Sequence, residues 1–311
     1  MPLKSGVNGM KKIVGIIGAG HVGADTAFSL VTQGLCDEIV LIDNNEAKAR
    51  SQGLELRDMA SLVASRVHIR VNDYDALRHA NVVVMAVGPK TLLRADRMEE
   101  LLETSATVRQ VVPLIMDSGF DGVIINITNP CDVITMVIQQ ISSLPKARVF
   151  GTGTSLDTAR MKRVVGELFD IDPKSVGGYV MGEHGESQFV AWSTVRIGER
   201  PITEWETTTP LDLAALKDQV RGGGWEILLG KGWTSFGIGT ATARLVHAVL
   251  CDARTVFPVS AWDKQHRVYI GQPAVIGAVG IARELLVPLT AEEHQAYAAS
   301  AGVISQAFAS L

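Results

Sequence analysis

The feature that most constrains the fold is an alternation, between Lys12 and Leu144, of short apolar runs with longer helical patterns. The runs are rich in β-branched residues, and each is too continuously apolar for a strand with one face in water. Strands and helices that alternate in this way build a doubly wound parallel sheet of the Rossmann type, an α/β fold with helices on both faces. The predicted strands are 13–18, 39–43, 67–71, 82–87, 123–128 and 148–151.

After Gly151 the pattern changes and predicts a second, mixed α+β domain. Its expected helices lie near 156–169, 211–228 and 234–253, and its expected strands near 175–181 and 188–197. Three strand-like runs follow between 255 and 286, and the capping-box spacing of Thr290 and Glu293 opens a last helix that reaches about residue 308. Because 311 residues exceed the size of one core, we expect two domains, 1–151 and 152–311.

Composition excludes several classes of protein. A net charge of −4 provides no basic field, so no nucleic-acid partner is expected. Cys36, Cys131 and Cys251 are far apart, which favours reduced thiols over disulfides, and neither they nor the histidines have metal-ligand spacing. No apolar run is long enough for a signal peptide or a membrane span, so a cytoplasmic protein without a membrane partner is predicted.

A glycine motif follows the first predicted strand and opens a helix. In Gly-Ala-Gly-His-Val-Gly, Gly18 permits a tight turn, Gly20 lets a pyrophosphate approach, and Gly23 packs the helix on the strand. The alternative is a tight turn with a structural role only. His21 is interpreted as a solvated residue at the helix start.

Asp43 ends the second predicted strand, 20 residues after Gly23. An acidic side chain at this place can accept hydrogen bonds from ribose hydroxyls and repel a 2′-phosphate, so NAD is favoured over NADP. The alternative is a turn residue, because Asp-Asn-Asn is also good turn chemistry.

Three polar residues in the second half are candidates for chemistry. His184 lies in a polar loop between Gly182 and Gly185, and imidazole is suited to proton exchange near neutral pH. Asp157 and Arg160 are three apart at the start of a predicted helix and can share one face. A surface histidine and an exposed ion pair remain the alternatives.

Five motifs in this order resemble those of the lactate/malate dehydrogenase superfamily. They are Gly-Ala-Gly-His-Val-Gly at 18–23, Thr-Asn-Pro-Cys-Asp at 128–132, Gly-Thr-Gly-Thr-Ser-Leu-Asp-Thr-Ala-Arg at 151–160, Gly-Glu-His-Gly-Glu-Ser at 182–187 and Gly-Lys-Gly-Trp-Thr-Ser at 230–235. The resemblance implies an NAD-dependent oxidoreductase that interconverts small 2-hydroxy and 2-oxo acids. It also implies a homo-oligomer, with a tetramer expected.

The resemblance assigns roles to individual residues. His184 would be the acid/base, Asp157 would orient it, and Arg160 would grip the substrate carboxylate. Asn129 would contact both cofactor and substrate, and Thr234 would lie near the substrate. The remaining cofactor contacts that it implies are Val22, Gly88, Ile127 and Ile238.

The segment after Gly88 is polar and is expected to form a lid. Arg97 stands nine residues after Gly88, at the family's spacing for the arginine that polarises the substrate carbonyl, although the neighbouring Arg94 is an alternative. Thr91 and Leu92 occupy the part of the lid where a malate enzyme would carry a cation. Oxaloacetate is therefore expected to be a poor substrate unless Arg94 pairs with its second carboxylate.

An apolar lid, together with Gly222-Gly223-Gly224 in a helical pattern, favours an aliphatic substrate side chain. This combination resembles the L-2-hydroxyisocaproate dehydrogenase branch of the superfamily. An ordinary L-lactate dehydrogenase is the alternative. A catalytically silent NAD-binding sensor is a more remote alternative, because it would not need the five polar residues proposed for the chemistry.

Overall fold

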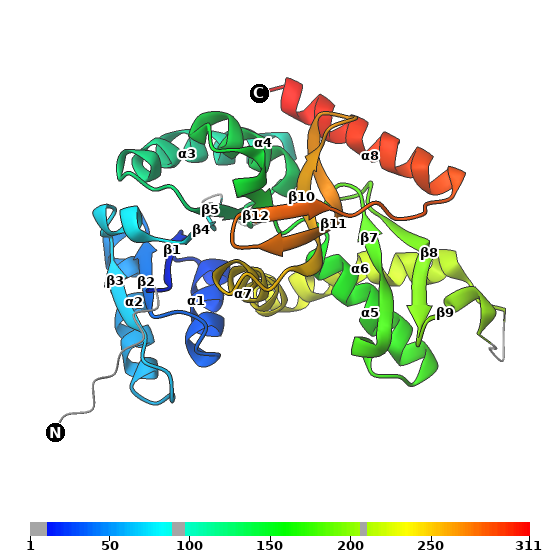
Figure 1. Ribbon diagram of the computed structural model, residues 1–311, viewed down its shortest axis with the longest axis horizontal. Helices are drawn as coiled ribbons and strands as arrows, with labels where there is room; N and C mark the ends of the chain where they lie inside the picture. The colour runs from blue at the N-terminus through cyan, green and yellow to red at the C-terminus, as the bar shows by residue number, and fades with distance from the viewer. Residues whose placement is uncertain (1–10, 89–96, 206–209) are drawn as a thin grey trace.

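The computed structural model describes residues 11–88, 97–205 and 210–311, without the side chains of 97–99. Its largest element is a nine-stranded sheet with the order β12-β11-β10-β6-β5-β4-β1-β2-β3 (Figure 1). Six strands are parallel and correspond to the six predicted runs: β1 (Ile13–Ile17), β2 (Glu38–Ile42), β3 (His68–Val71), β4 (Val82–Met85), β5 (Val123–Asn126) and β6 (Val149–Gly151). The strand order reverses between β1 and β4, which places a ligand crevice at their carboxyl ends.

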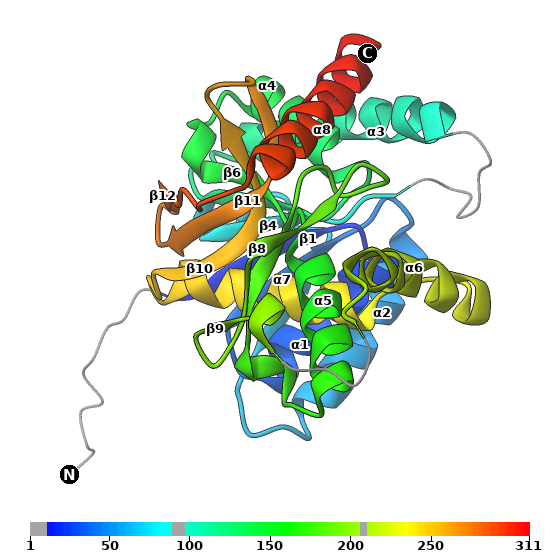
Figure 2. The same ribbon diagram turned by 90° about the vertical axis from the view of Figure 1, so that its right-hand side faces the viewer.

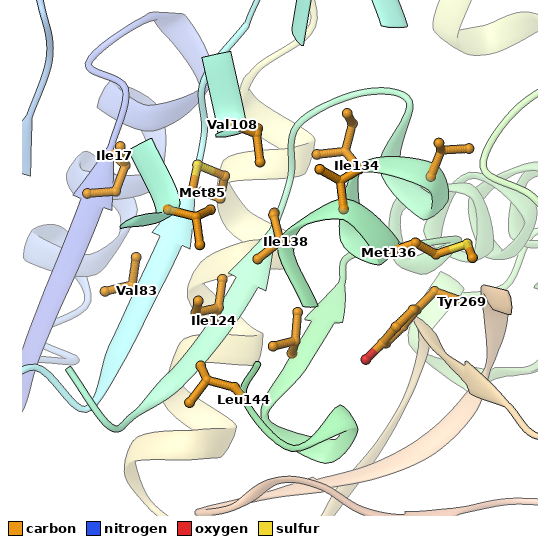
Figure 3. Close-up of a cluster of buried hydrophobic side chains, with 14 of the residues drawn as sticks. Ile17, Val83, Met85, Val108, Ile124, Ile134, Met136, Ile138, Leu144 and Tyr269 are labelled. Carbon is orange, nitrogen blue, oxygen red and sulfur yellow. The ribbon is translucent and has the colours of Figure 1, made fainter. Parts of the chain in front are cut away.

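The parallel strands are apolar throughout because both of their faces are buried. Val83 and Met85 of β4 point into one hydrophobic cluster, and Val82 and Val84 point into another on the opposite face. Figure 3 shows Val83, Met85 and Ile138 among the side chains of the first cluster, and the helix that carries Ile138 covers this face. Each large apolar side chain buried in this way contributes about 1.5–3 kcal/mol to folding.

Eight helices are assigned in the described parts of the chain: α1 (His21–Thr32), α2 (Glu46–Ala60), α3 (Arg97–Asp117), α4 (Cys131–Ser142), α5 (Ser155–Phe169), α6 (Leu213–Lys231), α7 (Phe236–Leu250) and α8 (Ala291–Ala309). Residues of α3, α4 and α8 belong to the first cluster, and residues of α1, α2 and α7 to the second. The side view in Figure 2 shows α3 and α8 above the sheet and α1 and α7 below it. The doubly wound fold predicted from the sequence is confirmed.

The second half of the chain contributes to two sheets. β10 (Thr255–Asp263) pairs with β6 through Ser260 and Gly151, and β11 (Val268–Gly277) and β12 (Gly280–Glu284) continue antiparallel at that edge. A separate three-stranded sheet comprises β7 (Val176–Met181), β8 (Phe189–Ile197) and β9 (Arg200–Pro201). The three strand-like runs near the end of the chain therefore extend the first sheet, which periodicity alone did not indicate.

Helix ends agree with the local sequence. Thr290 caps α8, and both hydrogen bonds of the capping box with Glu293 are present. α6 begins after Asp212, whose carboxylate accepts from the N–H groups of Ala214 and Ala215, and it continues without a break through the three glycines. Four short 3₁₀ helices complete the fold: η1 (Asp75–His79), η2 (Lys146–Arg148), η3 (Pro173–Ser175) and η4 (Ile202–Glu204).

Candidate active site

The glycine turn after β1 is shaped by close backbone contacts. Gly18 has φ +103°, and a Cβ there would lie 2.4 Å from the carbonyl oxygen of Ala86. A Cβ on Gly23 would lie 1.9 Å from the carbonyl oxygen of Gly18, so α1 could not pack on the turn with any larger residue. Gly20 differs, because its Cβ would meet only Lys48 Nζ at 3.7 Å. The approach to the turn at Gly20 is therefore open.

The start of α1 can receive an anion. Gly20 is its N-cap, no side chain caps it, and its first turn holds no acidic residue. The N–H groups of a first helical turn and the helix dipole favour a phosphate at such a place. The residues present thus fit the pyrophosphate of a dinucleotide.

Asp43 lies beside this turn at the end of β2. Its Oδ2 accepts from the N–H of Ala19 at 2.8 Å, its Oδ1 accepts from the N–H of Asn45 at 2.9 Å, and Lys48 Nζ is 3.6 Å away. The carboxylate is therefore both a turn residue and a negative group next to the dinucleotide crevice. The two readings of Asp43 proposed from the sequence are compatible.

The other predicted cofactor residues lie along the same end of the sheet. Ile127 follows β5 and is buried, whereas Gly88 follows β4 and a Cβ there would meet nothing within 4 Å. Val22 of α1 and Ile238 of α7 both pack, partly buried, on the cluster below the sheet. Four strands and two helices thus converge on the crevice.

His184, Asp157 and Arg160 form one hydrogen-bonded group. His184 Nδ1 lies 2.7 Å from Asp157 Oδ2, and Arg160 Nη1 donates to Asp157 Oδ1 at 2.9 Å. The side chain of Asp157 is 1% exposed, that of Arg160 14% and that of His184 25%. The ion pair on α5 is therefore not a surface pair. The Asp157 bond to Nδ1 leaves Nε2 of His184 as the ring nitrogen for a substrate.

The charges set the protonation of this group. Burial alone would lower the pKa of His184, but the negative charge and hydrogen bond of Asp157 outweigh it and raise that pKa above its ordinary value. Burial alone would raise the pKa of Asp157, but His184 and Arg160 hold it below its ordinary value. His184 is thus stabilised as the imidazolium, the form that can donate a proton.

A second carboxylate, Asp132, was not predicted from the sequence. It is 2% exposed at the start of α4, accepts from the backbone N–H of His184 at 2.8 Å and from Ser260 Oγ at 2.5 Å, and thereby ties the His184 loop to α4 and β10. Burial raises the pKa of Asp132 to about 6. The available signal was an acidic residue directly before the apolar run of α4.

The loop that carries His184 is also anchored to α8. Ser300 Oγ accepts from the N–H of Glu183 at 2.6 Å and lies 2.8 Å from Ser187 Oγ. Gly182 has φ +95°, and a Cβ there would lie 2.8 Å from Ser300 Oγ. The loop is therefore held before the imidazole by the backbone N–H of Glu183 and after it by the hydroxyl of Ser187.

The structure places the remaining predicted residues as follows. Asn129 is exposed between β5 and α4, three residues before Asp132, and Thr234 is half-buried just before α7. Arg97 is the first residue of α3, and its side chain is not described. Thr91, Leu92 and Arg94 lie outside the described residues.

The described parts of the chain show neither a metal-binding cluster nor a helix that could span a membrane. Within residues 11–88, 97–205 and 210–311, no group of three or more His, Cys, Asp or Glu side chains is placed to hold a metal ion. None of the helices described there combines the length and apolar character needed to cross a membrane. The three cysteines are free, with Cys36 and Cys131 buried and Cys251 exposed.

Comparisons with known proteins cover almost the whole chain. The family described as lactate/malate dehydrogenase, NAD binding domain, matches residues 12–151, and the one described as lactate/malate dehydrogenase, alpha/beta C-terminal domain, matches residues 154–309. L-lactate dehydrogenase 1 of Bifidobacterium longum is 40% identical over 288 residues, which are 90% of this chain and 91% of that protein. L-lactate dehydrogenase 2 of Enterococcus faecalis is 37% identical over 96% of this chain and 97% of its own.

Solved structures agree with this similarity. The minor L-lactate dehydrogenase from Enterococcus mundtii, in its ligand-bound form, superposes with a TM-score of 0.94 at 32% identity, over 97% of this chain and 99% of that one. A lactate dehydrogenase from a Medee basin deep-sea metagenome library gives 0.92 at 31% identity, over 96% and 98%. The likeness thus extends over both halves of the molecule.

Proposed function

Because this chain belongs to the lactate/malate dehydrogenase family and is an NAD-dependent oxidoreductase acting on a CH–OH group, we propose that its substrates are L-2-hydroxy acids with medium aliphatic side chains. The reverse reaction reduces the corresponding 2-oxo acids. The hydrogen-bonded group of His184, Asp157 and Arg160 is the observation that supports this chemistry best.

We assign the following roles. His184 donates a proton to the carbonyl oxygen in reduction and removes it in oxidation, while Asp157 holds the ring and stabilises its charge. Arg160 binds the substrate carboxylate with the guanidinium edge that Asp157 does not use. Arg97 polarises the carbonyl. Gly18, Gly20, Gly23 and Asp43 would hold the dinucleotide, which when bound would provide the hydride as NADH in reduction and take it up as NAD⁺ in oxidation. Asn129 and Thr234 border the reacting group.

A contact between α6 and the carboxylate clamp supports the substrate class. A Cβ on Gly224 would lie 3.2 Å from Arg160 Nη2 and 3.3 Å from its Cζ and Nη1. The guanidinium therefore packs closely on α6 at Gly224. Any larger residue at this position would force the guanidinium to move. We infer that the room left by Gly224 lets Arg160 hold the carboxylate of a longer 2-oxo acid.

L-lactate dehydrogenase is the second candidate. The relatives that match almost the whole chain carry that name, and the same polar group would serve pyruvate and lactate equally well. The two candidates differ only in how the side chain of the 2-oxo acid is accommodated.

A substrate panel distinguishes them. We expect 2-oxo acids of four to six carbons to give kcat/KM about 3- to 10-fold above that of pyruvate, since each buried methylene contributes up to ~0.8 kcal/mol. Oxaloacetate should be at least about tenfold poorer than pyruvate, because its second carboxylate would be unpaired. Steady-state NADH oxidation measures kcat/KM for the longer 2-oxo acids, for pyruvate and for oxaloacetate. The highest kcat/KM for pyruvate would favour L-lactate dehydrogenase.

Two variants of α6 test the clamp within the same panel. Gly224→Ala should push the guanidinium of Arg160 away from the helix and lower the ratio of six-carbon to three-carbon kcat/KM about threefold or more. Gly222→Ala is the matched control, because a Cβ there meets nothing within 4 Å and brings the same gain in helix propensity. Equal ratios in the two variants would show that Gly224 does not determine the preference for substrate length.

The pH profile should depend on Asp157. Reduction needs protonated His184, so kcat/KM for the 2-oxo acid falls as pH rises through the raised pKa of His184. Asp157→Asn removes the charge that raises this pKa, and the falling limb should move to lower pH. Glu167→Gln is the control, because Glu167 pairs with Arg163 on the exposed side of the same helix. If kcat/KM of Asp157→Asn fell over the same pH range as that of the unmodified enzyme, the role assigned to Asp157 would be contradicted.

We also propose that the chain assembles as a homotetramer in the cytoplasm. Support comes from large apolar side chains exposed at one end of α6 and the start of α7, where Trp225 is 51% exposed, Leu229 81% and Phe236 69%. Light scattering on the purified protein tests the assembly, and the mass of a single chain would contradict it.

A further inference from the structure

His21 is exposed at the start of α1, as predicted, and its imidazole also makes a ring contact. It is stacked on the indole of Trp233, with ring centroids 4.0 Å apart and planes 6° from parallel. His21 is the first residue of α1, inside the glycine motif, and Trp233 stands between α6 and α7. The stack therefore joins the cofactor turn to the segment whose next residue is Thr234.

The two helices behind this contact are closely packed. A Cβ on Gly239 of α7 would lie 3.0 Å from the carbonyl carbon of Asp25 and 3.1 Å from the nitrogen of Thr26 on α1, so the two backbones touch. Figure 1 shows α7 beside α1 beneath the sheet. The start of α7 is thus fixed against the helix that begins at the cofactor turn.

The segment before α7 is held by a second contact. Lys231 Nζ lies 3.3 Å from the ring centre of Phe236 and 5.5 Å from that of Trp233. It is also 3.5 Å from Ser235 Oγ. Trp233 and Thr234 lie between these anchors and are joined by one peptide bond.

We propose that the His21–Trp233 stack couples occupancy of the cofactor turn to the position of Thr234, which makes both aromatic residues positioning residues for the 2-oxo acid. The first turn of α1 would face the pyrophosphate of a bound dinucleotide, and His21 is part of that turn. Two parallel rings at van der Waals distance leave little room for independent movement. The inference rests on the proposed place of Thr234 beside the substrate.

Coupling of this kind is reciprocal. A dinucleotide that orders the turn improves binding of the 2-oxo acid, and a bound 2-oxo acid tightens the dinucleotide by the same factor. Aromatic pairs of this type typically change an equilibrium by about 2- to 10-fold. The stack should therefore change KM for the oxo acid more than kcat.

Three variants test the proposal with pyruvate as the probe. His21→Ala should raise KM for pyruvate about 3- to 10-fold at saturating NADH, with kcat within about twofold of the unmodified enzyme. His21→Phe keeps a flat ring and should restore KM to within about twofold. His79→Ala, at an exposed histidine in the same half of the chain, is the control and should leave KM unchanged.

A binding measurement separates this proposal from the proposed function. NAD⁺ should change the intrinsic tryptophan fluorescence of the unmodified protein, and Trp233→Phe and His21→Ala should each remove most of that change. If none of the 2-oxo acids is turned over, the proposed function fails, and this signal still reports whether the cofactor acts on the stack. An unchanged KM and an unchanged NAD⁺ response in His21→Ala would overturn the coupling, as would a KM in His21→Phe equal to that of His21→Ala.

Discussion

Replacement of His184 by asparagine should abolish most of the turnover while leaving NADH binding intact. Asparagine can still approach Asp157, but its amide cannot exchange a proton near neutral pH, so the carbonyl oxygen would lose its donor. We expect kcat for reduction of a 2-oxo acid to fall about 10²- to 10⁴-fold. The dissociation constant for NADH, measured by its fluorescence, should stay within about twofold.

The control for this experiment is His294→Asn, at an exposed histidine on α8. The same chemical change at that position should alter neither turnover nor NADH binding. Near-normal reduction rates in His184→Asn would reject the acid/base role. A loss of NADH binding together with turnover would instead indicate that the loop has collapsed.

Replacement of Arg160 by lysine should have the second largest effect. Lysine keeps the positive charge but cannot bind a carboxylate through two parallel hydrogen bonds, nor keep the planar contact with Gly224. A hydrogen bond to a charged group contributes about 1.5–3 kcal/mol, so kcat/KM for the 2-oxo acid should fall about 10- to 150-fold. Most of this loss should appear in KM if the clamp grips ground state and transition state alike.

Arg163→Lys is the matched control, because Arg163 lies one turn further along α5 and pairs with Glu167 on the exposed side. It should leave kcat/KM within about twofold, since exposed ion pairs contribute little. The inhibition constant of oxamate, a carboxylate isosteric with pyruvate, measures the clamp without turnover. Equal constants in the two lysine variants would contradict the role of Arg160.

Local patterns predicted the elements of the fold well. The six parallel strands were visible because both faces of such a sheet are buried and each strand is continuously apolar, as Val82 to Met85 illustrate. The cap at Thr290 was visible because a capping box involves residues only three apart. The pairing of β6 with β10 was not predicted, since Gly151 and Ser260 are 109 residues apart and strand periodicity does not identify a partner.

The residues of the candidate site likewise fall into those predicted from short spacings and those identified only from the packing. The glycine turn, Asp43 and the Asp157–Arg160 spacing each follow from residues close together in the chain. Asp132 and Trp233 were missed, because their partners His184 and His21 come from distant segments. The side chains of the lid lie outside what the structure describes, and Arg97 in its polarising role stays a prediction.

The amino-acid sequence by itself determined the parallel sheet, the dinucleotide turn at Gly18–Gly23 and the polar residues available for proton transfer, because these depend on periodicity and short spacing. Only the tertiary structure decided that His184 meets the buried carboxylate of Asp157, that Asp132 holds its backbone and that α6 packs on Arg160 at Gly224. Those contacts depend on how distant elements pack. Packing also places the charge of Asp157 beside His184, which keeps the imidazole protonated to higher pH than a histidine in water.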